Sequence, residues 1–281
     1  MIRIITDSAA DFEPQELERL KITCIPLTVR FGETEYQENI TLSKNQFYEL
    51  MLGCEELPKT SQASPQVLMD LFEDANNAGD EAIYFCLSSA LSGTYQNALM
   101  TKNLTGSDRC HVVDCLNATG GQRLILEYAA RLRDEGKNVQ EIIAGVEDIR
   151  SRIVLYACID TLEYLYKGGR ISQTVYKLGT LANIKPIITV ERDGGIGIPA
   201  KAMGMRKGMD YLCKQAELQP ADPDFPFYAM YTNNRSVAET LVTRLSSSGI
   251  TVPEDRIIQV GAAIGSHIGP DACGLVYVAK K

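Results

Sequence analysis

The chain has 281 residues, of which 45% are hydrophobic and 23% charged, and its formal net charge at pH 7 is −8. This length exceeds that of the usual single-core domain, so we expect two domains. The acidic balance and the lack of any basic run argue against nucleic-acid binding. No apolar stretch approaches membrane-span length and no signal-peptide pattern opens the chain. We therefore expect a cytoplasmic protein without stable membrane insertion.

Cofactor motifs are absent from the sequence. Eight cysteines are scattered without a CxxC pair, which is typical of reduced structural thiols rather than of a zinc site or a disulfide framework. The two histidines, His111 and His267, are too few for a His-based metal site, so no metal is expected. Neither a P-loop nor a first-strand GxGxxG fingerprint is present, so no nucleotide cofactor is expected.

The first half of the chain repeats one unit: an apolar strand, a polar loop and a helix. The three loops are Thr6–Ser8, Ser88–Thr94 and Asp114–Gly121. This alternation predicts a parallel sheet with helices on both faces, with ligands bound outside the carboxyl ends of its strands. Other elements expected here are a strand at 22–31, a hairpin turn at 32–33, a helix capped by Ser43, a polar loop at 58–65 and a helix opened by Ser64 and Pro65.

The pattern changes after the strand expected at 153–158. We therefore predict an N-terminal α/β domain over residues 1–158 and a C-terminal α+β domain over 159–281, with no obvious linker. The second domain is expected to contain a hairpin at 189–200, helices at 203–215 and 236–247, strands at 227–231, 257–260 and 275–278, and a glycine-rich loop at 265–274 that carries His267.

The loop Ser88–Thr94 is the strongest candidate binding element. It places four hydroxyl groups, those of Ser88, Ser89, Ser92 and Thr94, between a buried strand and a helix N-terminus. The unpaired N–H groups and the positive dipole end of such a helix bind anions. Because the loop has no Lys or Arg, a carboxylate suits it better than a polyphosphate. An ordinary N-cap beside a βα turn is the alternative interpretation.

Two further patterns leave alternatives open. A serine hydrolase could use Ser92 as nucleophile and His267 as base, although the glycine two residues before the serine of a nucleophile elbow is missing. Lys167 and Arg170 flank two glycines, a pattern that fits either a solvated loop or a contact with an anion or a partner protein.

Several clusters taken together resemble the DegV family, the fatty-acid-binding proteins that serve bacterial fatty acid kinase. They occur in the family's order and span essentially the whole chain. The matching clusters are Thr6–Ser8, Thr60–Pro65, Leu87–Tyr95, Thr161–Leu165, Lys167–Ser172, Asn183–Ile187 and His267–Pro270.

The resemblance implies one long-chain fatty acid held between two α/β domains, with its acyl tail in an apolar tunnel. It implies that the hydroxyl groups of Thr60 and Ser92 hold the carboxylate and that His267 belongs to the same network. The remaining head-group residues expected from the resemblance are Ser61, Gly93 and Thr94. A different small carboxylate or a phosphate ester is the alternative ligand.

The resemblance also implies a binding subunit without catalytic residues or cofactor of its own. Such a subunit presents the carboxylate to a separate ATP-dependent fatty acid kinase, which makes an acyl phosphate for phospholipid synthesis. Arg170 and Lys167 are expected to face that kinase.

Two positions depart from the family pattern. The loop Asp114–Gly121 lacks the serines usual after the aspartate, and Asp271 stands where glycine is common. The Asp271 carboxylate would repel a ligand head group if it pointed inward, or alter the partner-facing surface if it pointed outward.

Overall fold

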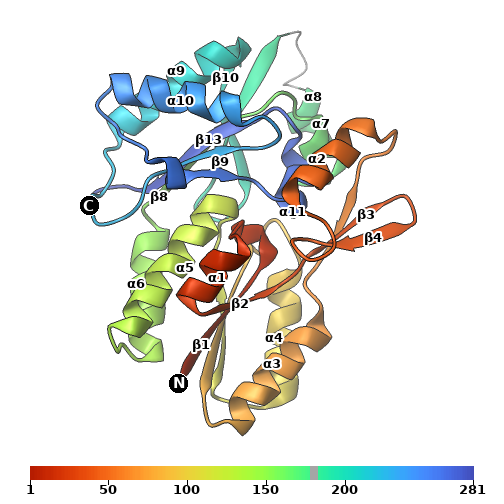
Figure 1. Ribbon diagram of the computed structural model, residues 1–281, viewed down its shortest axis with the longest axis vertical. Helices are drawn as coiled ribbons and strands as arrows, with labels where there is room; N and C mark the ends of the chain where they lie inside the picture. Colours follow the sequence, from red (N-terminus) through yellow and green to blue (C-terminus); the bar gives the residue numbers. More distant parts are fainter. Residues whose placement is uncertain (178–182) are drawn as a thin grey trace.

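The computed structural model describes residues 1–177 and 183–281, which form three β-sheets with helices packed around them. Figure 1 shows a sheet at each end of the long axis, with the chain running from the lower half into the upper half. None of the helices in these residues is long and apolar enough to cross a membrane.

The lower sheet is four-stranded and parallel, in the order β2-β1-β6-β7. Its strands are β1 (Ile2–Asp7), β2 (Ile22–Ile25), β6 (Glu81–Cys86) and β7 (Cys110–Asp114). Ile83 and Phe85 pack on one face with the long helices α5 (Thr119–Asp134) and α6 (Val139–Arg150). Tyr84 and Cys86 pack on the other with α3 (Pro65–Asn77) and α4 (Thr94–Thr105). Both faces are buried, and the predicted parallel sheet between helices is confirmed.

A small antiparallel sheet, in the order β4-β3-β5, stands beside the parallel one. It contains β3 (Thr28–Phe31), β4 (Thr34–Gln37) and β5 (Lys59–Ser61). The single strand expected over 22–31 is therefore two strands, and Pro26 lies in the break, where its missing N–H suits the change of sheet. Part of the expected loop 58–65 is β5, because residues 59–61 pair with β3. Ser43 caps α2 (Lys44–Gly53), as predicted.

The upper sheet has six strands in the order β10-β9-β8-β13-β11-β12. They are β8 (Ile153–Cys158), β9 (Ile184–Val190), β10 (Ile196–Met203), β11 (Tyr228–Tyr231), β12 (Ile257–Gln259) and β13 (Cys273–Val278). Leu275 and Tyr277 point to α9 (Gly204–Leu218) and α10 (Arg235–Ser247), while Val276 and Val278 pack in the core that contains α5. This second mixed α/β unit is confirmed (Figure 1).

Strand β8 was predicted to close the first domain, but it pairs with β9 and β13 and so belongs to the upper sheet. Helix α5 contacts strands of both sheets, so one core joins the two halves. A shared core of this kind explains why the sequence shows no linker between them.

The glycine-rich loop expected at 265–274 is wrong in its first part, which forms helix α11 (Ala262–Ile268). Gly265 lowers helix propensity, yet a Cβ there would lie 2.6 Å from the Tyr48 hydroxyl and 2.8 Å from the Phe47 ring. Close packing on α2 requires the glycine, and tertiary contacts outweigh its propensity. The remaining short helices are η1 (Ser8–Ala10), α1 (Pro14–Leu20), α7 (Glu163–Lys167), α8 (Gln173–Lys177) and η2 (Glu254–Arg256).

Candidate functional site

A cavity of about 460 Å³ lies between the carboxyl ends of the parallel strands and the inner face of the upper sheet. Its volume is in the range of small-molecule sites, ~300–1,000 Å³. Most of its wall is apolar and comes from both sheets, as in Leu87, Leu155, Ile188, Val190, Ile196 and Ala272. The cavity therefore sits where ligands of open parallel sheets bind.

The polar side chains that the sequence singled out reach this cavity from four separate segments. Thr60 and Ser61 come from β5, Ser92 from the loop after β6, Arg170 from the turn after α7, and His267 from α11. Gly93 lines the cavity beside Ser92. The structure thus brings together residues that lie up to 207 positions apart.

Thr60 and His267 are joined directly, with 2.9 Å between Thr60 Oγ1 and His267 Nε2. Thr60 is held in place because its backbone pairs with Val29 on β3. The other ring nitrogen, Nδ1, is buried without a hydrogen-bond partner among residues 1–177 and 183–281. A Cβ on Gly168 would lie 2.2 Å from that nitrogen, so the ring packs on the Gly168 backbone.

The His267 ring is neutral at physiological pH. Burial, with a smaller contribution from the Arg170 charge, lowers the pKa of His267 to about 3. A neutral ring can donate or accept at Nε2 according to its tautomer. His267 is therefore suited to hydrogen bonding at the cavity rather than to binding an anion by charge.

Ser92 faces the cavity, and Thr94 supports it from behind. Ser92 Oγ lies 2.9 Å from Thr94 Oγ1, and the Thr94 N–H donates to Ser92 Oγ at 3.3 Å. Thr94 is buried at the start of α4 and is not part of the cavity wall, so its predicted place at the head group becomes a supporting one. A Cβ on Gly93 would lie 2.3 Å from Gln62 Nε2, so the glycine leaves room for the Gln62 side chain that follows β5.

Arg170 lines the cavity, whereas the sequence placed it toward a partner protein. Its Nε donates to the Leu91 carbonyl at 2.9 Å and its Nη1 to the Gly168 carbonyl at 2.6 Å. Burial lowers its pKa, and no carboxylate in the described parts of the chain forms an ion pair with it. Lys167 instead lies outside the cavity, is 55% exposed and pairs with Glu163 Oε1 at 2.6 Å.

The geometry does not assemble a hydrolase. Ser92 bonds to Thr94 rather than to His267, and His267 bonds to Thr60. Within the described residues no carboxylate bonds to His267 Nδ1 to orient the ring. A general base also works best with a pKa near the operating pH, and that of His267 is lowered to about 3.

Of the two departures from the family pattern, the loop Asp114–Gly121 contributes Ala118 and Thr119 to the cavity wall, whereas Asp271 does not reach it. Asp271 is exposed and is not part of the cavity wall. Asp114 accepts hydrogen bonds from the backbone N–H groups of Ser89 and Leu116 at 3.2 and 2.8 Å. Asp114 therefore shapes the loop that carries Ser92, and Asp271 belongs to the outer surface.

Comparison with known proteins places the chain in a family. The family model described as "Uncharacterised protein, DegV family" matches residues 1–280. The chain belongs to the DegV family. It is 32% identical over 283 residues to a DegV domain-containing protein of Caldanaerobacter subterraneus, covering 99% of each chain. It is 33% identical over 275 residues to one of Clostridium perfringens, covering 95% of this chain and 93% of the relative.

Solved structures of the family share the whole fold. A DegV family protein of Thermus thermophilus, described by its fatty acid binding, superposes with a TM-score of 0.89 at 26% identity, covering 99% of each chain. DegV of Bacillus subtilis, described as a fatty acid binding protein, superposes with a TM-score of 0.86 at 28% identity, again covering 99% of each. This chain thus shares its fold with relatives that are described as fatty acid binding proteins.

Proposed function

We propose that this protein binds one long-chain fatty acid in the cavity between its sheets. The carboxylate lies at the polar end formed by Thr60, Ser92 and His267, and the acyl tail runs along the apolar wall. The observation that carries the proposal is the cavity itself, which is apolar over most of its wall and groups its hydrogen-bonding side chains with the Arg170 guanidinium, which has no carboxylate partner among residues 1–177 and 183–281.

The energetics of such a ligand support this assignment. Burying an acyl chain contributes about 0.8 kcal/mol per CH₂ group, so the tail supplies most of the affinity. Hydrogen bonds to the carboxylate add less but fix its position. Arg170 supplies positive charge beside neutral His267, which favours an anionic head group. The fatty-acid-binding relatives of T. thermophilus and B. subtilis support the same ligand class.

We further propose that the protein is not an enzyme by itself and presents the bound carboxylate to a separate ATP-dependent fatty acid kinase in the cytoplasm. Phosphoryl transfer to the carboxylate there would make an acyl phosphate for phospholipid synthesis. The absence of a P-loop or dinucleotide motif from the sequence supports this division of labour. Arg170, at the polar end of the cavity, is suited to the extra negative charge of an acyl phosphate.

The decisive experiment is solvent extraction and mass spectrometry of the purified protein without added lipid. A long-chain fatty acid present at about one molecule per chain would support the ligand class. A protein that is empty and also fails to take up added palmitate or oleate would contradict it. Recovery of a short carboxylate or a phosphate ester would replace the fatty acid by that ligand.

Kinase presentation needs a separate test. The loaded protein is mixed with ATP and a fatty acid kinase subunit, and acyl phosphate is trapped with hydroxylamine. Formation of the hydroxamate that requires both proteins would support presentation. Hydroxamate formed by this protein and ATP alone would show an enzyme instead.

A further inference from the structure

Two buried carboxyl groups lie behind the cavity wall, on segments far apart in sequence. Asp11 follows η1 and Glu38 follows β4, and their exposed fractions are 1% and 2%. Asp11 Oδ1 accepts from the Gly261 N–H at 2.9 Å, and Glu38 Oε1 accepts from the Ala263 N–H at 3.0 Å. Since Gly261 is the N-cap of α11, both carboxyl groups cap the first turn of that helix.

The glycine at position 261 is required by this arrangement. A Cβ there would lie 2.3 Å from Glu38 Oε1 and 2.8 Å from Asp11 Oδ1. Its φ of −79° is available to any residue, so the reason for the glycine is space and not backbone conformation. Both carboxyl groups can contact the start of α11 because residue 261 has no side chain that would occupy their space.

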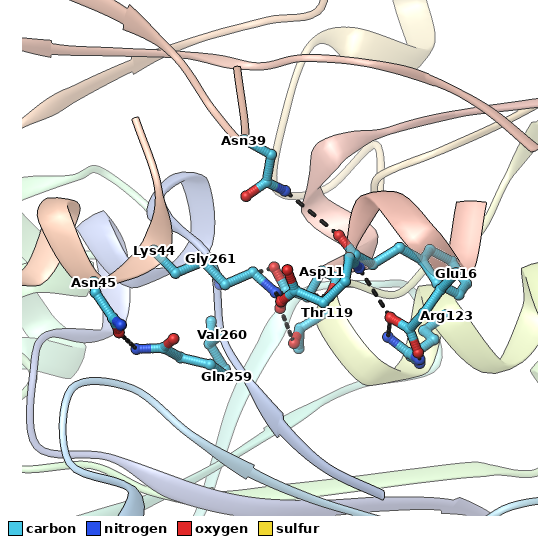
Figure 2. Close-up of polar contacts among 12 residues, drawn as sticks. Asp11, Glu16, Asn39, Lys44, Asn45, Thr119, Arg123, Gln259, Val260 and Gly261 are labelled. Carbon is cyan, nitrogen blue, oxygen red and sulfur yellow. Dashed lines mark hydrogen bonds and ion pairs between the residues drawn. The ribbon is translucent and has the colours of Figure 1, made fainter. Parts of the chain in front are cut away.

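The same carboxyl groups hold other parts of the cavity wall. Thr119 Oγ1 donates to Asp11 Oδ2, as Figure 2 shows, and Thr119 adopts a left-handed φ of 46° that is unusual for a β-branched residue. Ser8 Oγ donates to Glu38 Oε2 at 2.5 Å and accepts from the Leu27 N–H at 2.9 Å. Thr119 and Leu27 both line the cavity, as does Ala263.

Little positive charge reaches the pair directly. Lys44 Nζ donates to the Asp11 backbone carbonyl at 2.9 Å (Figure 2). It also donates to Glu13 Oε1 at 2.7 Å, and not to either buried carboxyl group. Arg123 is paired with Glu16. The titratable and charged groups that interact with the pair are Lys44 and Tyr48 from α2, Arg123 from α5, and Cys24 from β2.

Burial therefore governs the protonation of the two groups. It raises the pKa of Asp11 to about 6 and that of Glu38, helped by the Asp11 charge, to about 7. Near neutral pH the pair changes from a protonated state to one in which two like charges lie close together.

Helix α11 connects this pair to the polar end of the cavity. With seven residues it is about 10 Å long, so its first turn leads directly into its last turn on one continuous helix. Its wall residues include Ala263 and Ile264 near the start and His267 near the end, where the ring meets Thr60. A displacement of the first turn must move the His267 ring.

We propose that Asp11 and Glu38 are positioning residues of the cavity, whose carboxyl groups fix the first turn of α11 and thereby set His267 against Thr60. The ligand part of the test rests on the proposed function, since it measures fatty acid affinity. The positioning itself is a property of this chain and has a readout that needs no ligand.

The test compares Asp11→Ala and Glu38→Ala with the amide variants Asp11→Asn and Glu38→Gln, which keep an acceptor for the N–H groups of α11. Palmitate affinity of the delipidated protein at pH 6 is measured by calorimetry. We expect the alanine variants to bind about tenfold more weakly, because they leave a buried N–H unpaired, and the amide variants to bind like wild type. Asp80→Ala is the matched control, because Asp80 is 9% exposed and pairs with Met1 and Arg3 at the opposite end of the sheet.

The ligand-free readout uses the two histidines. Selective ¹⁵N-histidine labelling gives one set of ring signals for His267 and one for His111, which lies on β7 outside the cavity wall. We expect the His267 signals to shift in Glu38→Ala, to return in Glu38→Gln, and the His111 signals to stay constant. Alanine variants with wild-type affinity and an unchanged His267 signal would overturn the proposal.

If the alanine variants fail to fold, the comparison of wild type with Glu38→Gln at two pH values tests the proposal instead. At pH 6 we expect wild type and Glu38→Gln to bind palmitate with equal affinity. At pH 8 we expect wild type to bind about threefold more weakly than Glu38→Gln, because the ionised Asp11 and Glu38 carboxylates repel each other and displace the start of α11. Parallel pH profiles would overturn the proposal. If wild type binds no palmitate at all, the proposed function fails, while the pH dependence of the His267 signal in the two proteins still tests the positioning.

Discussion

At the scale of single residues, Thr60 and Ser92 each bring a neutral hydroxyl group to the cavity wall. We expect Thr60→Ala combined with Ser92→Ala to weaken fatty acid retention about a hundredfold or more, since each of the two lost hydrogen bonds to a carboxylate is worth roughly 1.5–3 kcal/mol. Both side chains are half-buried, so the fold should survive. Ligand content by mass spectrometry and a thermal melt measure the two effects, with Ser89→Ala as the control. Unchanged ligand content in the double variant would contradict this head-group site.

Arg170 leads to a second prediction at this scale. Its charge is one cause of the lowered pKa of His267, so Arg170→Ala should raise the pKa of His267 toward its ordinary value, which burial still opposes. The variant should also bind fatty acid more weakly, because a half-buried cation is lost from the cavity. Ring chemical shifts followed over pH, and palmitate affinity, check the two outcomes. Lys167→Ala, on the exposed side of the same turn, should change neither, and equal effects of both variants would refute the distinction.

At the scale of elements, the turn after α7 packs on helix α11 and contains two adjacent glycines that are needed for different reasons. A side chain on Gly168 would collide with His267, whereas Gly169 has open space but a φ of +76°. We expect Gly168→Ala to impair both stability and ligand binding, and Gly169→Ala to cost about 1 kcal/mol of stability with binding intact. Denaturant unfolding and palmitate titration separate the two. Loss of binding in Gly169→Ala alone would contradict this account.

The elements also show what the sequence could and could not predict. Apolar runs followed by polar loops predicted β1, β6 and β7 and the sheet they form, because burial on both faces leaves a strong pattern. Helix α11 was missed because Gly265 has low helix propensity. The glycine is needed there for close packing against Phe47 and Tyr48, and these residues are far from it in the sequence.

The site was predicted in the same uneven way. Thr60, Ser92 and His267 were found through polar clusters and the family resemblance, and the structure brings them to one cavity. The inward position of Arg170 and the roles of Asp11 and Glu38 were not found, because charged residues usually predict solvent exposure. Their burial follows from long-range packing.

At the scale of the whole molecule, buried titratable groups make stability depend on pH. The pKa of Glu38 is raised to about 7 and that of Asp11 to about 6, so the folded state holds protons that the unfolded chain releases above about pH 4. Their contribution to the free energy of unfolding is therefore present at low pH and lost as pH rises to 7. His267 has the opposite effect on stability between about pH 3 and 6.5. Its pKa is lowered in the folded state, so its contribution to the free energy of unfolding increases as pH rises through this range.

The difference between wild type and Glu38→Gln isolates one group. We expect the free energy of unfolding of wild type to fall relative to Glu38→Gln as pH rises from 4.5 to 7, because the amide cannot ionise. Urea unfolding at a series of pH values measures the difference. A difference that is constant over this range would show that Glu38 is already ionised in the folded protein.

The position of β13 has a consequence for how the protein is made. This strand lies in the interior of the upper sheet, between β8 and β11, yet it follows both of them in the chain. The ribosome therefore synthesises β8 through β12 before β13. Until β13 has been made, the edges of β8 and β11 that pair with it have no partner strand. Cys273 and Gly274 of β13 also line the cavity, so its wall is incomplete on the nascent chain until β13 has been made. The ligand proposed for this cavity would therefore be enclosed only after β13 has joined the sheet.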